Sequence, residues 1–221
     1  MRPVWTAAAI VAVSVTVVGV RRSGLRGAAP AATNTAATIP IYNAALMQLD
    51  AALIRLDSSL ARRDNATARH TFREARAMYK RVELFAEYYG ESEVRALNGV
   101  PLQKAEDEDP EAPLPPIGLQ VVEGIVFPTL DTARVKDARQ LVTYMRIAVS
   151  SLLRAGADTM PGDAYLFDAM RQEITRVSTL GIAGFDTGAS GDAIVESAEA
   201  LQGVRDAFVP YRAELARRAP A

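Results

Sequence analysis

The chain has 221 residues, of which 49% are hydrophobic, and its 25 basic and 26 acidic residues leave a formal charge of −1. This apolar content excludes a wholly disordered chain, and the length gives room for one domain with a sizeable core. Because no basic field covers the sequence, we expect no nucleic-acid partner. The absence of cysteine excludes disulfides, thiolate nucleophiles and covalently attached c-type haem, so we expect no haem in this chain.

The N-terminus carries an apolar run, Val4–Val20, with arginines on both sides. The run is near the lower length limit for a membrane-spanning helix and long for a signal peptide. We therefore predict a signal peptide or membrane anchor over residues 1–22, and a periplasmic or extracytoplasmic domain that is anchored or secreted. Residues 23–38 are rich in Gly, Ala, Pro and Thr, which is typical of a flexible linker, so the domain is expected over residues 39–218.

Two long helices are predicted at the start of the domain, over Ile41–Arg62 and Thr67–Tyr89. Asp64 and Asn65 separate them and can cap the second helix, and Gly90 is placed to end it. Both helices repeat apolar residues alternately four and three positions apart, which is the spacing of a continuous packing seam. The seam residues are Tyr42, Leu46, Leu49, Leu53, Leu56 and Leu60 in the first helix, and Ala75, Met78, Val82, Phe85 and Tyr89 in the second.

The rest of the chain continues the helical pattern around one proline-rich, acidic segment, Pro101–Pro116, which predicts a long loop. Pro210 is expected to kink the last helix. The predicted helices are Glu91–Leu97, Gly118–Phe127, Thr132–Ala155, Asp163–Leu180 and Asp192–Arg217. The residues expected to face inward are Leu141 or Val142 with Met145, Val149 and Leu152, then Phe167, Met170, Ile174 and Val177, and finally Ile194, Leu201, Val204, Phe208, Tyr211 and Leu215. No segment alternates with the period of a strand, so we predict an all-α, up-and-down helical bundle.

Two groups of polar residues lie beside these apolar seams. Arg76, Tyr79 and Glu83 are three and four positions apart, so they share one helix face next to the seam of the second helix. Gln120 and Glu123 lie on one face of a short, otherwise apolar helix. Half-buried polar groups need partners, because an unpaired buried charge is costly. These residues therefore predict either internal ion pairs or a polar site.

The machinery of common enzymes is missing from the sequence. His70 is the only histidine and has no metal-ligand spacing. The chain contains no G-x-S-x-G, P-loop or G-x-G-x-x-G motif. These observations favour a non-catalytic protein.

The segment Gly118–Glu123 resembles the G-x-H-x-x-E motif of the imelysin family, and Ala75–Glu83 resembles the A-R-x-x-aromatic-x-x-x-E helix of that family. Together with Glu87–Tyr89, Ala96–Gly99 and the acidic loop, they are similar to the imelysin-like region that precedes the di-haem domain of some bacterial cytochrome c peroxidases. The resemblance implies an all-helical, imelysin-like domain in an exported protein.

The resemblance also implies a site. Its ligand-binding residues would be Arg76, Tyr79, Glu83, Asn98, Gln120 and Glu123, and Arg76 or Glu83 is expected within hydrogen-bond distance of Glu123. A metal ion, if one binds, would be held by Glu83, Glu87 and Glu123. Gln120 replaces the motif histidine, and an amide cannot act as a general base.

Four functions follow as alternatives. The first is a non-catalytic domain that binds a ligand or a partner, such as a separately encoded di-haem peroxidase or electron-transfer protein, with the acidic loop Glu106–Glu111 as the docking surface. The second is a periplasmic iron- or copper-binding protein of metal uptake. The third is a metallopeptidase, for which H-E-x-x-H is missing. The fourth is a helical spacer whose polar residues serve stability alone.

Overall fold

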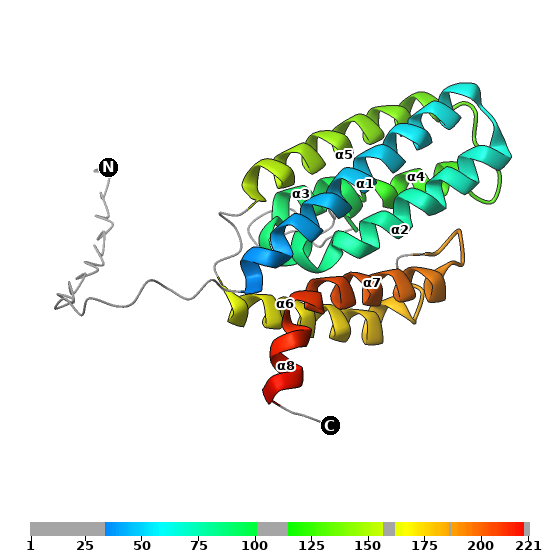
Figure 1. The fold of residues 1–221 in the computed structure, drawn as a ribbon. Coiled ribbons are helices and arrows are strands. Elements are labelled where there is room, and N and C mark those ends of the chain that lie inside the picture. The colour runs from blue at the N-terminus through cyan, green and yellow to red at the C-terminus, as the bar shows by residue number, and fades with distance from the viewer. Residues whose placement is uncertain (1–33, 101–114, 157–161, 186, 219–221) are drawn as a thin grey trace, which may run out of the picture. The chain divides into compact units, whose positions relative to one another are not determined.

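The computed structural model describes residues 34–100, 115–156, 162–185 and 187–218. All regular secondary structure in these ranges is helical, which confirms the all-α prediction and is compatible with a helical bundle (Figure 1). The predicted anchor over 1–22 and residues 101–114 of the predicted loop, including Glu106–Glu111, lie outside the described residues.

The first two helices, α1 (Asn34–Arg62) and α2 (Asn65–Tyr89), form a tightly packed antiparallel pair. The leucine seam of α1 is buried as predicted, and Met78 and Tyr89 of the α2 seam are partly buried against the same core. Asp64 caps α2, because its carboxylate accepts hydrogen bonds from the backbone N–H of Thr67 at 3.1 Å and from the Thr67 hydroxyl at 2.6 Å. Local capping and heptad spacing thus account for this pair.

The start of α1 corrects the predicted linker boundary, because residues 34–38 are helical although Pro40 lies inside the helix. Tertiary hydrogen bonds hold this first turn. The Thr35 backbone N–H and hydroxyl both donate to Asp163 Oδ1, at 3.1 and 2.6 Å, and the Thr38 hydroxyl donates to the Ala207 carbonyl at 3.3 Å. These partners are remote in sequence, so local composition alone indicated a linker there.

Helix α5 (Val135–Ala155) packs along α1 and completes the first layer of the bundle, while the short helices α3 (Glu91–Asn98) and α4 (Leu119–Val126) pack against it. Gly118, directly before α4, has φ +68°, and a Cβ there would lie 2.3 Å from the Leu97 carbonyl oxygen. A glycine is therefore required for α4 to start against the end of α3. This close approach brings Gln120 beside Asn98.

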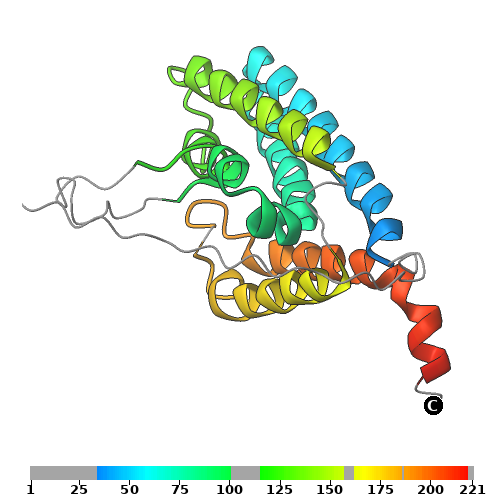
Figure 2. The same ribbon diagram turned by 90° about the vertical axis from the view of Figure 1, so that its left-hand side faces the viewer.

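The second layer consists of α6 (Asp163–Arg176), a π-helical turn (Val177–Gly181) and α7 (Ala193–Phe208). In Figures 1 and 2, α6 and α7 run side by side along one side of the α1–α2–α5 layer. A 3-10 turn (Val209–Tyr211) and α8 (Arg212–Arg218) follow, and the chain changes direction at this turn. The kink predicted at Pro210 is thus confirmed.

The inward face predicted for the last helix is wrong in part. Tyr211 is buried, and Val204 and Phe208 are partly buried against the core, but Ile194 and Leu201 of α7 and Leu215 of α8 are exposed. The face that α7 buries carries Glu196, Ser197, Ala200, Gly203 and Ala207. The reason is close contact with α2, because a Cβ at Gly203 would lie 2.3 Å from the Arg81 carbonyl oxygen. Large side chains cannot fit between backbones at this distance, so they turn outward.

Helix α6 shows the same reversal in part. Met170 and Val177 are buried as predicted, whereas Phe167 and Ile174 are exposed. The buried side of α6 includes Glu173, a position that the apolar pattern assigned to neither face.

By length and composition, α1 could also cross a membrane. Its leucines are buried against α2 and α5, as expected for the core helix of a bundle.

Candidate functional site: a buried charge network and an apolar groove

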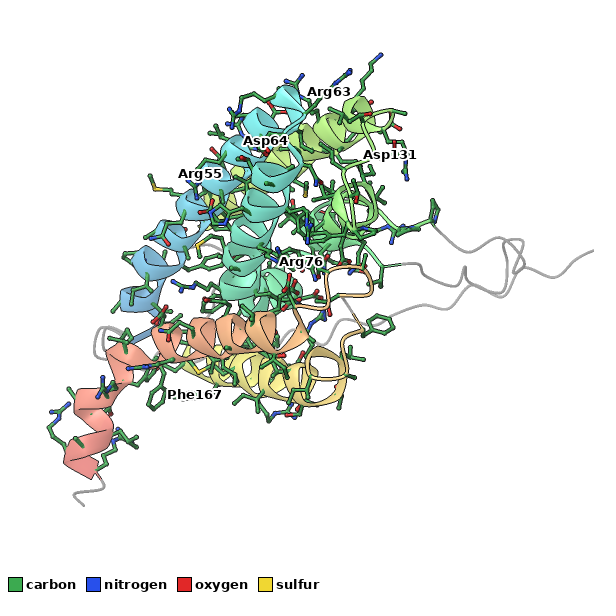
Figure 3. All side chains as sticks on the ribbon, turned by 90° about the vertical axis from the view of Figure 1, so that its right-hand side faces the viewer. Arg55, Arg63, Asp64, Arg76, Asp131 and Phe167 are labelled. Atoms are coloured by element: carbon green, nitrogen blue, oxygen red, sulfur yellow. The ribbon has the colours of Figure 1, made fainter. Side chains whose placement is uncertain are left out.

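Arg76 of α2 is the largest buried side chain of the interface between the two layers, with only 1% of its surface exposed. Its Nε and Nη2 donate to the two carboxylate oxygens of Glu196 on α7, at 3.0 and 2.7 Å. Figure 3 shows Arg76 pointing from α2 into the space that α7 borders. Two parallel bonds to one carboxylate fix both the distance and the orientation of the helices.

Asn98 and Gln120 extend this pair to the short helices. Arg76 Nη1 donates to Asn98 Oδ1 at 2.5 Å, and Gln120 Nε2 donates to the same oxygen at 3.2 Å. The predicted residues Arg76, Asn98 and Gln120 therefore do come together, and they join α2, α3, α4 and α7.

One helical turn further along α2 lies a second group of charges. Lys80 Nζ donates to both carboxylate oxygens of Glu83 at 2.9 Å, and Arg176 of α6 approaches Glu83 Oε1 to 3.4 Å. Arg176 also pairs with Glu87 through its Nη2. Burial works to lower the pKa of Arg176, but Glu83 and Glu87 raise it more, so this guanidinium stays charged.

Tyr79 completes the group on the α2 side. Its hydroxyl donates to Glu87 Oε1 at 3.4 Å. Burial raises the pKa of this phenol well above its usual value, and the charge of Glu83 adds to that effect. Tyr79 is therefore neutral and serves as a hydrogen-bond donor.

Glu173 of α6 faces Glu83 inside the same network, with 2% of its surface exposed. Burial, and next the neighbouring charge of Glu83, raise the pKa of Glu173 to about 8. Its Oε1 has no hydrogen-bond partner in the described part of the chain. Glu173 is therefore protonated at neutral pH, so the interface between α2 and α6 contains a neutral carboxyl group.

The space inside the network is small. A cavity of about 10 Å³ lies between Lys80, Glu83, Glu173 and Arg176 on one side and Thr187, Glu196 and Ser197 on the other. This volume has room for about one water molecule. The Ser197 hydroxyl, the Glu173 Oε1 and the Arg176 Nε are buried there without a hydrogen-bond partner among the described residues. The network thus leaves space for water but not for an organic ligand.

Glu123 does not meet Arg76 or Glu83, so the predicted contact is wrong. Its Oε1 accepts the backbone N–H of Ser190 at 2.8 Å and that of Ala189 at 3.4 Å, in the segment before α7. Glu123 is nevertheless buried, so its carboxylate holds this segment against α4. Backbone donors carry no sequence signature, which is why a side-chain partner was expected instead.

The three predicted metal ligands are not brought into one cluster. Glu83 and Glu87 both form ion pairs with Arg176, whereas Glu123 accepts a hydrogen bond from the backbone N–H of Ser190. Within the described ranges, no group of three or more His, Asp or Glu residues could hold a metal ion. The geometry therefore gives no support to the metal-binding alternative.

Three charged members of the network were missed from the sequence: Glu173, Arg176 and Glu196. The signal for Glu196 was present, since Glu196, Ala200, Gly203 and Ala207 recur four, three and four positions apart. A stripe of small residues with one acid at this spacing indicates close helix packing around a buried charge pair. The outward apolar residues of α7 formed a competing pattern and hid this stripe.

The outer side of α6 and α7 forms an apolar groove of about 600 Å³. The groove is lined by Phe167, Met170, Arg171, Ile174, Thr175, Leu201, Val204, Arg205 and Phe208. Figure 3 shows Phe167 on the side of α6–α7 that faces away from α2. Its volume falls within the range of about 300–1,000 Å³ that binding clefts occupy.

In comparisons with known proteins, no family model matches the chain, and no curated protein matches it significantly. The resemblance to the imelysin family therefore stays a prediction, carried by the two motifs and by the helical fold.

Proposed function

We propose that this chain is a non-catalytic, exported helical domain that binds a partner protein through the outer groove of α6 and α7. The single observation that carries the proposal is the groove itself, in which Phe167, Ile174 and Leu201 are exposed although they belong to helices of a well-packed bundle. Apolar side chains grouped on the outer side of packed helices form a surface whose removal from water on binding is favourable.

The shape and charge of the groove indicate the kind of partner. Two roughly antiparallel helices border it, which suits an amphipathic helix laid between them. Arg171 and Arg205 are among its lining residues; Arg171 pairs with Asp168 of α6 at 2.6 Å, whereas Arg205 forms no ion pair within the described residues. An amphipathic helix with acidic residues beside its apolar face therefore complements the groove best.

The buried charge network has a supporting role in this proposal. It holds α6 and α7 on α2 through Arg176 and through the Arg76–Glu196 pair, and so keeps the groove rigid. A rigid groove loses less conformational freedom on binding, which increases affinity.

The N-terminal apolar run supports a compartment outside the cytoplasm. The resemblance to imelysin-like regions supports the choice of partner. We propose that the domain acts outside the cytoplasm, imelysin-like in fold and anchored or secreted. Its first candidate partner is a separately encoded di-haem peroxidase or an electron-transfer protein of the same cell.

Binding of the purified full chain to that peroxidase tests the proposal, measured by biolayer interferometry. We expect saturable binding, weakened at least about tenfold by the double substitution Ile174→Glu and Leu201→Glu, because both changes place charge in the groove.

Ile147→Glu is the matched control, because Ile147 is an exposed apolar residue of α5 outside the groove. It should bind like the unmodified chain. Absence of binding to the peroxidase would remove that partner, and an equal loss in the control would remove the groove as the docking surface.

A further inference from the structure

A second cavity, of about 200 Å³, lies where α1, α2, α3 and α5 meet. It is lined by Tyr42, Phe85, Tyr89, Gly90, Glu93, Leu152 and Ala155. It shares no lining residue with the charge network or with the α6–α7 groove. Its chemistry is therefore independent of the partner surface proposed above.

Three aromatic rings form one wall of this cavity. The ring centroids of Tyr42 and Phe85 are 4.7 Å apart in an edge-to-face arrangement, and those of Phe85 and Tyr89 are 6.4 Å apart with nearly parallel planes. Aromatic faces carry negative electrostatic potential, so rings that line a cavity from different angles attract a cation.

Glu93 also lines the cavity, and two hydroxyls hold its carboxylate in place. Ser151 donates to its Oε1 at 2.8 Å and Ser92 donates to its Oε2 at 2.7 Å. These two hydrogen bonds, that of Ser92 first, lower the pKa of Glu93, so it is ionised at neutral pH. No lysine or arginine of the described residues forms an ion pair with it.

Tyr42 and Tyr89, which line the cavity, also carry phenol hydroxyls. Both hydroxyls are buried and lack a hydrogen-bond partner within the described residues. A buried donor without a partner costs free energy, which a bound acceptor would recover. Burial raises the pKa of Tyr89 to about 12 and that of Tyr42 further, so both remain donors at physiological pH.

We propose that this cavity binds a small organic cation of the alkylammonium class, above all a quaternary ammonium that carries an oxygen atom. The cationic head would lie against the three rings beside Glu93, which supplies the missing counter-charge. The oxygen of the ligand would accept a hydrogen bond from Tyr42 or Tyr89. A methylated head suits this lining because it has no N–H to satisfy and covers apolar surface.

Calorimetric titration of the full chain with choline tests this site. Choline has a quaternary ammonium head and one hydroxyl, and its uncharged carbon analogue has a tert-butyl group in place of the head. We expect saturable binding of choline, and binding of the analogue weakened about tenfold or more, because the cation–π and carboxylate attractions are lost.

Two variants complete the test. Glu93→Gln should weaken choline binding about tenfold, whereas Glu91→Gln, an exposed neighbour outside the cavity, should leave it unchanged. Ala155→Leu fills the cavity from a half-buried position and should abolish binding without disturbing the core.

Circular dichroism and thermal melting of each variant separate loss of binding from loss of folding. Absence of saturable heat with choline, equal binding of the uncharged analogue, or unchanged binding in folded Glu93→Gln or Ala155→Leu would each overturn the proposal.

Discussion

The two layers of this bundle are held together in different ways. In the α1–α2–α5 layer, leucine and valine side chains fill the space between helices, and charges such as the Arg146–Asp50 pair stay at the surface. Between α2 and the α6–α7 layer, the helices meet through small residues and a buried charge network, and several large apolar residues, including Phe167, Ile174 and Leu201, face outward. The first layer thus buries its apolar residues in the core, whereas the second leaves part of them exposed on its outer side.

This difference shows that the apolar stripe of a helix need not be the face that the fold buries. In α1 the two coincide. In α7 they are separate faces of one helix, because Gly203 and Ala207 allow close backbone contact on one side while Leu201 and Val204 face the groove.

The largest effect is expected from breaking the charge pair between the layers. Arg76→Ala leaves the buried carboxylate of Glu196 without its counter-charge, which should lower the free energy of unfolding by about 3–5 kcal/mol. Urea denaturation followed by circular dichroism measures this change. The paired substitution Arg76→Met with Glu196→Leu removes both charges and should recover most of the loss. A single variant as stable as the unmodified chain would contradict a structural role for the pair.

The next effect concerns the close contact of α2 and α7. Gly203→Ala places a Cβ 2.3 Å from the Arg81 carbonyl oxygen, so the helices must separate, at a cost of about 1–3 kcal/mol. Gly124→Ala is the matched control, because Gly124 is exposed in α4 with no atom within 4 Å of such a Cβ. That control should stabilise the protein by about 0.4–1 kcal/mol. Thermal melting of both variants checks the predicted opposite signs.

The pH dependence of stability distinguishes the two layers further. The pKa of Glu173 is about 8 in the folded protein, against an ordinary value of 4.5. Between these values the folded state binds one proton more than the unfolded state, so stability falls as pH rises, by up to about 1.4 kcal/mol per pH unit. Glu173→Gln should remove most of this slope between pH 5 and 8. Denaturation at several pH values provides the measurement, and an unchanged slope in the variant would refute the assignment.

Because of Glu87, the stability of the Glu173→Gln variant should still depend on pH. Its pKa is also raised by burial, and Arg176 opposes the shift. Glu87 therefore leaves a residual slope of the same sign in Glu173→Gln.

The smallest effect is expected for a charge pair inside the first layer. Arg146→Ala removes the contact with Asp50 at 2.7 Å, but 45% of the arginine side chain is exposed. Solvent screens such a pair, so the loss should stay below about 1 kcal/mol. Urea denaturation in low and high salt gives the value and its screening. A loss as large as that of Arg76→Ala would erase the contrast between the layers.

Most of the fold was predictable because it follows from local signals. The heptad seams of α1 and α2, the Asp64 cap, Gly90 and Pro210 each act within a few residues, and the structure agrees with each of them. The start of α1 at Asn34 was not predictable, because it depends on Asp163 and Ala207, which are far away in sequence.

The candidate site was predictable in part for the same reason. Arg76, Asn98 and Gln120 come together as expected, but their partner Glu196 lies beyond the segments that resemble a known family. Glu123 accepts its hydrogen bond from a backbone amide, and a backbone amide has no sequence signature. A charge in an apolar helix therefore predicts that a partner exists and does not identify it.

The junction at the start of α1 has a mechanical consequence. Thr35 and Tyr211 both donate to Asp163, and Asn34 donates to Glu214, so the first turn of the domain is fastened to its last helices. Tension that enters the domain through residue 34 reaches these few hydrogen bonds before it reaches the leucines of α1. Pulling from this end should therefore peel α1 away from α6 and α8 first, while the far end of the α1–α2 pair remains intact.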